Sequence, residues 1–321
     1  MIVKERSIPL RLRVDEALLR RIHVENPKRS MIQEDLAKMN AGYKGEQAID
    51  YYINFLSQEN YHIFHDLRLK KDDLFFQIDT LILTLKFILI IEIKNIAGSI
   101  YFEPIFKQLI RTNDEKEEGF PDPISQAQRK QQLLIKWLKS HKFPVIPIDY
   151  LIVISFPSTI INSSKRMSKY YQKICHLHTF QEKVEELNQH YQEQKLTTRE
   201  LNKLKKLLLK SHTPLKNHPP CPFNIQESEI LTGVQCPSCL HIPMIRVKGN
   251  WSCPKCQTKS KDAHIQAVND YFLLFDHTMT NQQMREFIHL KSPDTATRLL
   301  VSMDLSFTGS GKGRVYFNNN D

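Results

Sequence analysis

The stretch QIDTLILTLKFILIIEIKN, residues 77–95, gives the clearest indication of the fold in the central part of the chain. It contains most of two apolar segments, Leu74 to Leu83 and Phe87 to Ile93, which are rich in Ile, Leu and Phe and long enough to cross a core. Segments of this composition and length predict two strands of a buried sheet. The same stretch carries three charged side chains: Asp79, Glu92 and Lys94.

These charges occupy positions that a buried sheet would fill with aliphatic residues. Glu92 and Lys94 are two positions apart, so they share one face of their strand. A hairpin that turns at Leu85-Lys86 would place Asp79 opposite Glu92. Two adjacent carboxylates repel, and a divalent cation such as Mg²⁺ would relieve that repulsion. A structural salt-bridge cluster is the alternative, although buried triads of charge rarely offset their desolvation cost.

The flanking segments predict alternating helices and strands. Apolar spacing predicts a helix over residues 45–57 and another at about 125–138, with strands at 61–68, 99–102, 105–110 and 148–155 and a charged loop at 113–119. Residues 1–40 look helical, and we expect no strand in residues 160–218. The pattern predicts an α/β fold, with a mixed central sheet flanked by helices.

Four short motifs in this region resemble those of a known family. They are Gly42-x-x-Gly45-Glu46, Gln77-Ile-Asp79, Ile91-Glu92-Ile-Lys94-Asn95 and Pro123-x-x-Gln126. Their types and order are similar to the NERD (nuclease-related) domain of the PD-(D/E)XK, restriction-endonuclease-like superfamily, over roughly residues 40–155. The resemblance implies a restriction-endonuclease-like core.

The resemblance also implies a metal-dependent phosphodiesterase, an endodeoxyribonuclease being the first expectation. Asp79 and Glu92 would hold Mg²⁺ or Mn²⁺, and Lys94 would orient or help to deprotonate the attacking water. Glu46 would reach the metal through water, and Gln126 would contact the phosphate or Lys94. Lys130, one helical turn beyond Gln126, could join it on that face. For Glu46 a plain helix-start carboxylate, and for Gln126 a surface-helix position, are the alternatives.

Four cysteines form two C-x-x-C pairs near the C-terminal third of the chain, at Cys236, Cys239, Cys253 and Cys256. Two such pairs thirteen residues apart predict a tetrahedral, structural Zn²⁺ site in a small β-hairpin that turns at Lys248-Gly249-Asn250, which resembles a zinc ribbon. A complete shell of four thiolates leaves no open position for a substrate, so we expect no catalysis there. Cys175 and Cys221 have no obvious partners, and we interpret them as incidental thiols.

The last segment, residues 263–321, predicts helices followed by a glycine-rich basic hairpin, FTGSGKGRVYF. This order is typical of a winged helix-turn-helix, which would place Thr295, Thr297 and Arg298 near a DNA groove and Lys312 and Arg314 on the wing. A small domain that packs against another part of the protein is the alternative.

Five segments follow from these features. They are an N-terminal helical extension (1–39), a nuclease-like domain (40–158), a basic helical segment and linker (159–222), a zinc ribbon (223–262) and a winged-helix-like DNA-binding domain (263–321). The net charge of +10 favours an anionic partner, with nucleic acid, and DNA in particular, before a membrane surface. Residues 81–91 form the longest apolar run, far short of the roughly 20 residues that cross a bilayer. With no apolar signal-peptide segment at the start, we expect a cytoplasmic protein.

Three functional hypotheses remain on the sequence. The first is a Mg²⁺-dependent nuclease whose ribbon and C-terminal domain position DNA. The second is a catalytically inactive protein that binds nucleic acid or regulates another protein. The third is a scaffold whose ribbon and C-terminal segment bind protein. The complete set of Asp79, Glu92 and Lys94 favours the first over the second.

Overall fold

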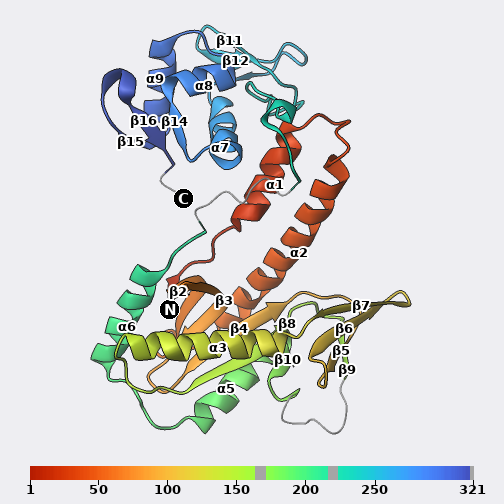
Figure 1. The fold of residues 1–321 in the computed structure, drawn as a ribbon, viewed down its shortest axis with the longest axis vertical. Coiled ribbons are helices and arrows are strands. Elements are labelled where there is room, and N and C mark those ends of the chain that lie inside the picture. The colour runs from red at the N-terminus through yellow and green to blue at the C-terminus, as the bar shows by residue number, and fades with distance from the viewer. Residues whose placement is uncertain (163–170, 216–222, 319–321) are drawn as a thin grey trace. The chain divides into compact units, whose positions relative to one another are not determined.

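The computed structural model describes residues 1–162, 171–215 and 223–318, which divide into two compact units (Figure 1). Unit 1 consists of Met1–Ile8 and Asn40–Pro214, and unit 2 of Pro9–Met39 and Leu215–Asp321. Cys221 and the side chain of Lys312 lie outside the described residues. The division into five segments stays a prediction.

The larger sheet of unit 1 is mixed and has six described strands, in the order β1-β2-β3-β4-β8-β10. Strands β2, β3 and β4 pair antiparallel, whereas β1 pairs parallel with β2, and β8 pairs parallel with both β4 and β10. The bounds are β1 Ile2–Lys4, β2 His62–Lys71, β3 Leu74–Leu83, β4 Ile88–Lys94, β8 Ile148–Ile154 and β10 Ile174–His176.

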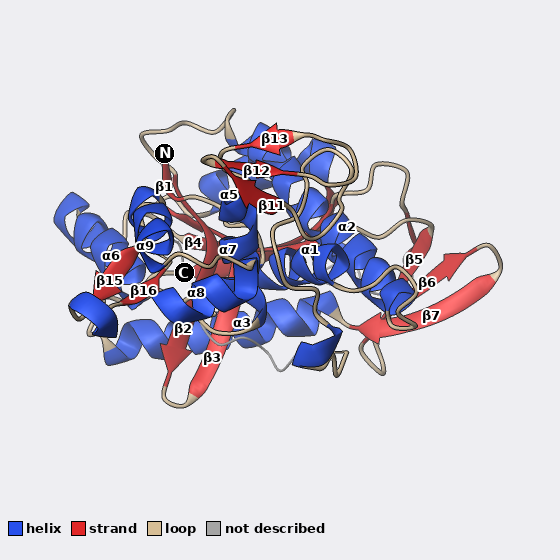
Figure 2. Ribbon diagram, turned by 90° about the horizontal axis from the view of Figure 1, so that it is seen from above, coloured by secondary structure: helices blue, strands red, loops and turns tan. Residues whose placement is uncertain are grey.

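Helices cover both faces of this sheet, as Figures 1 and 2 show. The residues of α3 (Pro123–Ser140) and α6 (Thr198–Ser211) share one buried apolar cluster with the sheet. The residues of α2 (Arg29–Ile53) and α5 (Phe180–His190) share a second cluster with the opposite face. A short 3₁₀ helix, Leu177–Thr179, precedes α5. The predicted α/β class with a mixed, helix-flanked central sheet is thus confirmed.

A second, four-stranded sheet has the order β7-β6-β5-β9; β5, β6 and β7 lie between β4 and α3 along the chain, and β9 follows β8. Its bounds are β5 Ser99–Glu103, β6 Gln108–Asn113, β7 Lys116–Pro121 and β9 Ile160–Asn162. In Figure 2, β6 and β7 form a long projecting hairpin. Strands β5, β6 and β7 therefore connect β4 to α3, the two elements that carry Glu92, Lys94 and Gln126.

Unit 2 combines helices with two small sheets. Its helices are α1 Leu10–Arg21, α7 His264–Leu274, α8 Asn281–Ile288 and α9 Pro293–Ser302, with 3₁₀ helices at Glu227–Glu229 and Gly311–Gly313. The first sheet has the order β11-β12-β13 and the second β14-β16-β15. Their bounds are β11 Ile245–Val247, β12 Asn250–Ser252, β13 Lys259–Ser260, β14 Thr278–Thr280, β15 Ser306–Thr308 and β16 Val315–Phe317.

A buried ion pair joins the first and later parts of unit 2. Arg21 on α1 donates from Nε to Oδ2 of Asp270 on α7 at 2.8 Å, and both side chains are fully buried. Arg20 donates to the other oxygen of the same carboxylate at 2.9 Å. Helix α1 therefore belongs structurally with α7, far from it in sequence.

Local sequence signals account for most element boundaries. Thr197 and Glu200 form the capping box that begins α6, and Thr280 and Gln283 form the one that begins α8. The hairpin predicted between the two cysteine pairs is present as β11 and β12. Three predictions were wrong. Residues 2–4 form strand β1, the charged loop at 113–119 contains most of β7, and residues 160–218 contain β9 and β10.

Within the described ranges, no helix is both long and apolar enough to cross a membrane.

Candidate active site

The register of β3 against β4 is the one expected from the sequence. Thr80 pairs with Ile91, and the backbone N–H of Ile93 donates to Oδ2 of Asp79 at 3.2 Å. Asp79 and Glu92 therefore lie next to each other on adjacent strands. Because alternate residues of a strand face opposite sides, the packing of Ile88 and Ile90 against α3 places Glu92 on the α3 side.

The first turns of helix α3 lie near Asp79 and Glu92. Asp122 caps the helix by accepting hydrogen bonds from the backbone N–H groups of Ile124 and Ser125, and Pro123 stands at its first position. The helix then presents Gln126 and, one turn later, Lys130 toward the strands.

Four charged side chains and one amide meet there. Lys94 donates from Nζ to Oε1 of Glu92 at 2.8 Å and to Oε1 of Gln126 at 3.2 Å. Lys130 donates to Oε2 of Glu92 at 2.6 Å and to Oδ1 of Asp79 at 3.1 Å. Each of the four carboxylate oxygens thus accepts one N–H, and the two ammonium groups balance the two carboxylates.

Burial and neighbouring charge shift the pKa values of these groups. Burial, followed by repulsion from Glu92, raises the pKa of Asp79. Burial alone would raise the pKa of Glu92, but Lys130 and Lys94 outweigh it and lower that pKa. Burial alone would lower the pKa of Lys130, but Asp79 and Glu92 raise it. Lys130 is consequently a charged ammonium held by its two carboxylates.

Glu46 lies apart from these contacts. Its Oε2 accepts from Nη1 of Arg6 at 3.1 Å, and Arg6 also pairs with Asp50 at 3.1 Å and with Asp66 at 3.6 Å. Burial, followed by repulsion from Asp79, raises the pKa of Glu46 to about 7. The charge of Asp79 thus influences Glu46, while the ion-pair partner of Glu46 is Arg6.

A glycine on α2 brings Glu46 to this end of the sheet. A Cβ atom added to Gly45 would lie 2.7 Å from Oγ of Ser155, and closer still to Cβ of Asn95. Asn95 also donates from Nδ2 to the backbone oxygen of Ala41 at 2.6 Å. Only a residue without a side chain allows α2 this approach to the ends of β4 and β8.

The sequence did not single out every residue that takes part. Arg6 is separated from its partners by 40 to 74 positions, and no local pattern in the sequence marks it. Lys130 follows Gln126 by one helical turn, and that spacing was the signal for it. Asn95, the last residue of the third motif, directly follows β4 and contacts α2.

The four cysteines of unit 2 form a compact cluster. Their sulfur atoms all lie within 4.8 Å of one another, with Cys236 Sγ 3.5 Å from Cys256 Sγ and Cys239 Sγ 3.6 Å from Cys253 Sγ. Four sulfurs bound tetrahedrally at ~2.3 Å from Zn²⁺ would be about 3.8 Å apart. The thiols therefore fit a structural metal site. Elsewhere in the described ranges, no group of three or more metal-ligating side chains converges.

The residues predicted to contact DNA lie on α9 and the following hairpin. The hydroxyl groups of Thr295 and Thr297 make hydrogen bonds within α9 and its N-cap. Thr295 Oγ1 donates to Ser292 Oγ at 3.2 Å, and Thr297 Oγ1 donates to the backbone oxygen of Pro293 at 3.1 Å. Arg298 is exposed. Thr297 and Arg314 line a hollow of about 600 Å³ together with Arg285, whereas Thr295 and Arg298 do not line it.

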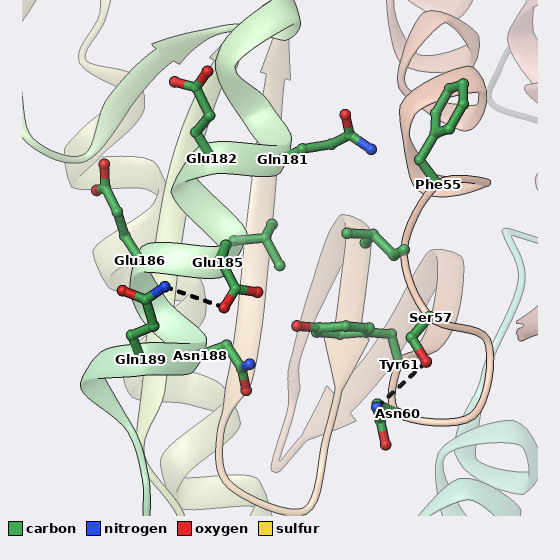
Figure 3. A pocket seen from close by; sticks show the side chains of 12 residues that line it. Phe55, Ser57, Asn60, Tyr61, Gln181, Glu182, Glu185, Glu186, Asn188 and Gln189 are labelled. Carbon is green, nitrogen blue, oxygen red and sulfur yellow. Dashed lines mark hydrogen bonds between the residues drawn. The ribbon is translucent and has the colours of Figure 1, made fainter.

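Another hollow in unit 1, of about 660 Å³, lies between α5 and the residues that follow α2 (Figure 3). Figure 3 shows Phe55 and Tyr61 on one side and the carboxylates of α5 on the other: Glu182, Glu185 and Glu186. None of the predicted site residues lines it.

Comparison of the chain with curated proteins and with solved structures gives no match. A family model does match, and the matched segment contains the four motifs and the Asp79, Glu92 and Lys94 group described above. Residues 41–155 match the model of the nuclease-related domain family, and the central part of this chain is therefore a nuclease-related (NERD) domain.

Proposed function

We propose that the protein is a metal-dependent nuclease that hydrolyses phosphodiester bonds of DNA at the Asp79, Glu92 and Lys94 site. The observation that carries this proposal is the convergence of these three side chains with Gln126, from two strands and one helix, at one end of the sheet. The match of residues 41–155 to the nuclease-related domain family, with this group inside the matched segment, supports the proposal.

The residues fit a hard divalent cation. Asp79 and Glu92 supply carboxylate oxygens, the ligands that Mg²⁺ and Mn²⁺ prefer. Lys130 lies within 3.1 Å of one oxygen on each, so both carboxylates face a common position that a cation can fill. Two protein carboxylates are a usual set for Mg²⁺, which keeps waters and binds substrate phosphate oxygens at its other positions. When bound, the metal would polarise the phosphate and lower the pKa of a coordinated water.

The chain's own residues would act around that position. The ammonium of Lys94, held by Glu92 and Gln126, would orient the attacking water and offset negative charge that develops on the phosphate. The Gln126 amide keeps Nε2 available to donate to a phosphate oxygen while Oε1 holds Lys94. Glu46, with a pKa of about 7, would exchange a proton near neutral pH.

Unit 2 would hold the DNA. Arg298 on α9 and Arg314 on the hairpin would supply positive charge for the phosphates, and Thr295, Thr297 and, on the sequence alone, Lys312 would add further contacts. In this proposal the zinc-bound cysteines keep the ribbon folded and take no part in chemistry.

A cleavage assay tests the proposal. Purified wild-type protein with Mg²⁺ or Mn²⁺ should cut plasmid, linear or single-stranded DNA, and Asp79→Ala and Lys94→Met should each lose at least about a hundredfold in rate. Lys136→Met serves as the control, because Lys136 is an exposed lysine on α3 that takes no part in the site contacts described above.

Equal cleavage by wild type and Asp79→Ala would show that a contaminant is responsible, and no cleavage by wild type on any substrate would overturn the proposal. In the latter case, salt-dependent DNA binding that survives both substitutions would favour the inactive nucleic-acid-binding protein instead.

A further inference from the structure

We propose that Lys130 occupies the divalent-cation position of the metal-free protein and has to leave it before Mg²⁺ or Mn²⁺ can bind. This inference rests on the proposed function, since it concerns the same pair of carboxylates. It concerns a residue for which the motifs gave no separate role.

The geometry places Lys130 between the two carboxylates. Its Nζ atom lies 2.6 Å from Oε2 of Glu92 and 3.1 Å from Oδ1 of Asp79. Lys130 therefore bonds both carboxylates at once. Lys94 contacts only Glu92 of this pair and uses the other oxygen, Oε1. The remaining oxygen of Asp79 accepts the backbone N–H of Ile93. The two oxygens that face each other are therefore the two that Lys130 holds.

Charge makes the two occupants mutually exclusive. With both lysines in place, two ammonium groups balance two carboxylates, and the site has no excess negative charge to attract a cation. A divalent ion added beside Lys130 would leave a net charge of about +2 in a largely buried site, which repulsion disfavours strongly. The ion and the ammonium would also compete for the same lone pairs on Asp79 and Glu92.

The side chain has room to leave. Lys130 retains 19% exposure of its side chain, compared with 4% for Glu92. It extends from α3 on a flexible stem of four methylenes, whose end can move several ångströms without any change in the helix. Gln126, one turn nearer the helix start, lies beside Lys94 and marks the side on which substrate would approach in the proposed function.

Calorimetric titration with Mn²⁺ tests the exclusion directly. Lys130→Met removes the competing ammonium and keeps a side chain of similar length, so it should bind Mn²⁺ about tenfold more tightly than wild type. Lys136→Met, on the same helix but exposed, should bind as wild type does. Equal or weaker binding by Lys130→Met overturns the inference, and so does the absence of Mn²⁺ binding by every variant.

A second measurement uses the wild-type protein and so does not depend on the folding of a variant. Acetylation by an amine-selective reagent, followed by peptide mass spectrometry, should label Lys130 slowly without metal and several-fold faster with saturating Mn²⁺. Lys136 should be labelled at the same rate in both conditions. An unchanged or slower rate at Lys130 overturns the inference.

The two proposals can fail separately. If Lys130 stays in place while cleavage still requires Asp79 and Lys94, the nuclease stands and only the exclusion is wrong. If Mn²⁺ binds more tightly to Lys130→Met but no DNA is cut, the exclusion stands and the nuclease is wrong.

Discussion

Lys130 and Glu92 form an ion pair of 2.6 Å in which the two side chains are only 19% and 4% exposed. Charges removed from water to this extent cost several kcal/mol each unless they are paired. The pair therefore holds α3 against β4, and its disruption should affect folding as well as chemistry.

Glu92→Gln should destabilise the metal-free protein by about 3 kcal/mol, because Lys130 and Lys94 both lose a charged partner. The double variant Glu92→Gln, Lys130→Met should lose less stability than the sum of the two single variants, since either single change already breaks the Glu92–Lys130 ion pair. Urea unfolding in the presence of EDTA measures each variant and gives the coupling energy. Additive effects would mean that the two residues do not interact in solution.

Glu46→Gln should change how stability depends on pH. The raised pKa of Glu46, about 7 against an ordinary 4.5, means that the folded state prefers the protonated acid. The resulting stabilisation is complete below about pH 4.5 and is lost as the pH rises toward 7. Wild type should therefore lose about 2 kcal/mol relative to Glu46→Gln between pH 5 and 8, measured by urea unfolding. A constant difference across that range would show that the Glu46 pKa is not raised.

Gly45→Ala should destabilise the protein by about 1–3 kcal/mol, because the new methyl group would meet Asn95 and Ser155. Gly42→Ala provides a matched control on the same helix, since a Cβ there meets nothing within 4 Å. Alanine is the better helix former by about 1 kcal/mol, so that substitution should stabilise. The two changes of opposite sign, followed by thermal unfolding, would test how closely α2 approaches β4.

Removal of the Zn²⁺ that we propose at the four cysteines should unfold the ribbon of unit 2. Trp251, on β12, is fully buried, and the second tryptophan of the chain, Trp137, is in unit 1. In a Trp137→Phe variant, a zinc chelator should shift the remaining fluorescence to longer wavelength as Trp251 meets water. In Trp251→Phe, the emission of Trp137 should not change, which separates ribbon unfolding from general denaturation.

Arg298→Ala and Arg314→Ala should each weaken DNA binding and lower the slope of log K against log salt by about one. Arg199→Ala, an exposed arginine on α6 of unit 1, should leave the slope unchanged. Fluorescence anisotropy over a series of salt concentrations measures all three. Identical slopes for the wild type and the unit 2 variants would favour a packing or protein-binding role for this segment.

The sequence predicted those parts of the fold that depend on local pattern. Strands β3 and β4 are long and apolar, so their limits and their register followed from composition and from the turn between them. The charged residues in them stood out because they break that pattern. Helix starts at Thr197 and Thr280 were predictable because a capping box is formed by residues three positions apart.

The rest depends on contacts between distant segments. Strands β1, β9 and β10 have three residues each and are strands only because a longer neighbour supplies hydrogen bonds. Strand β7 has a polar, charged sequence and pairs with β6 despite it, as the Arg111–Glu118 ion pair illustrates. Arg6 reaches Glu46 and Asp66 only after β1 has joined the sheet, which no local pattern indicates.

The fully buried pair of Arg21 and Asp270 sets a condition on the order of events during synthesis. The two residues are 249 positions apart, so a ribosome releases α1 long before α7 exists. Until then, Ala17 and Leu18, which are fully buried in the finished structure, have no α7 to cover them. Contacts this distant in sequence slow folding and leave apolar surface open to aggregation. Expression at low temperature, or with chaperones in excess, should accordingly raise the yield of folded protein.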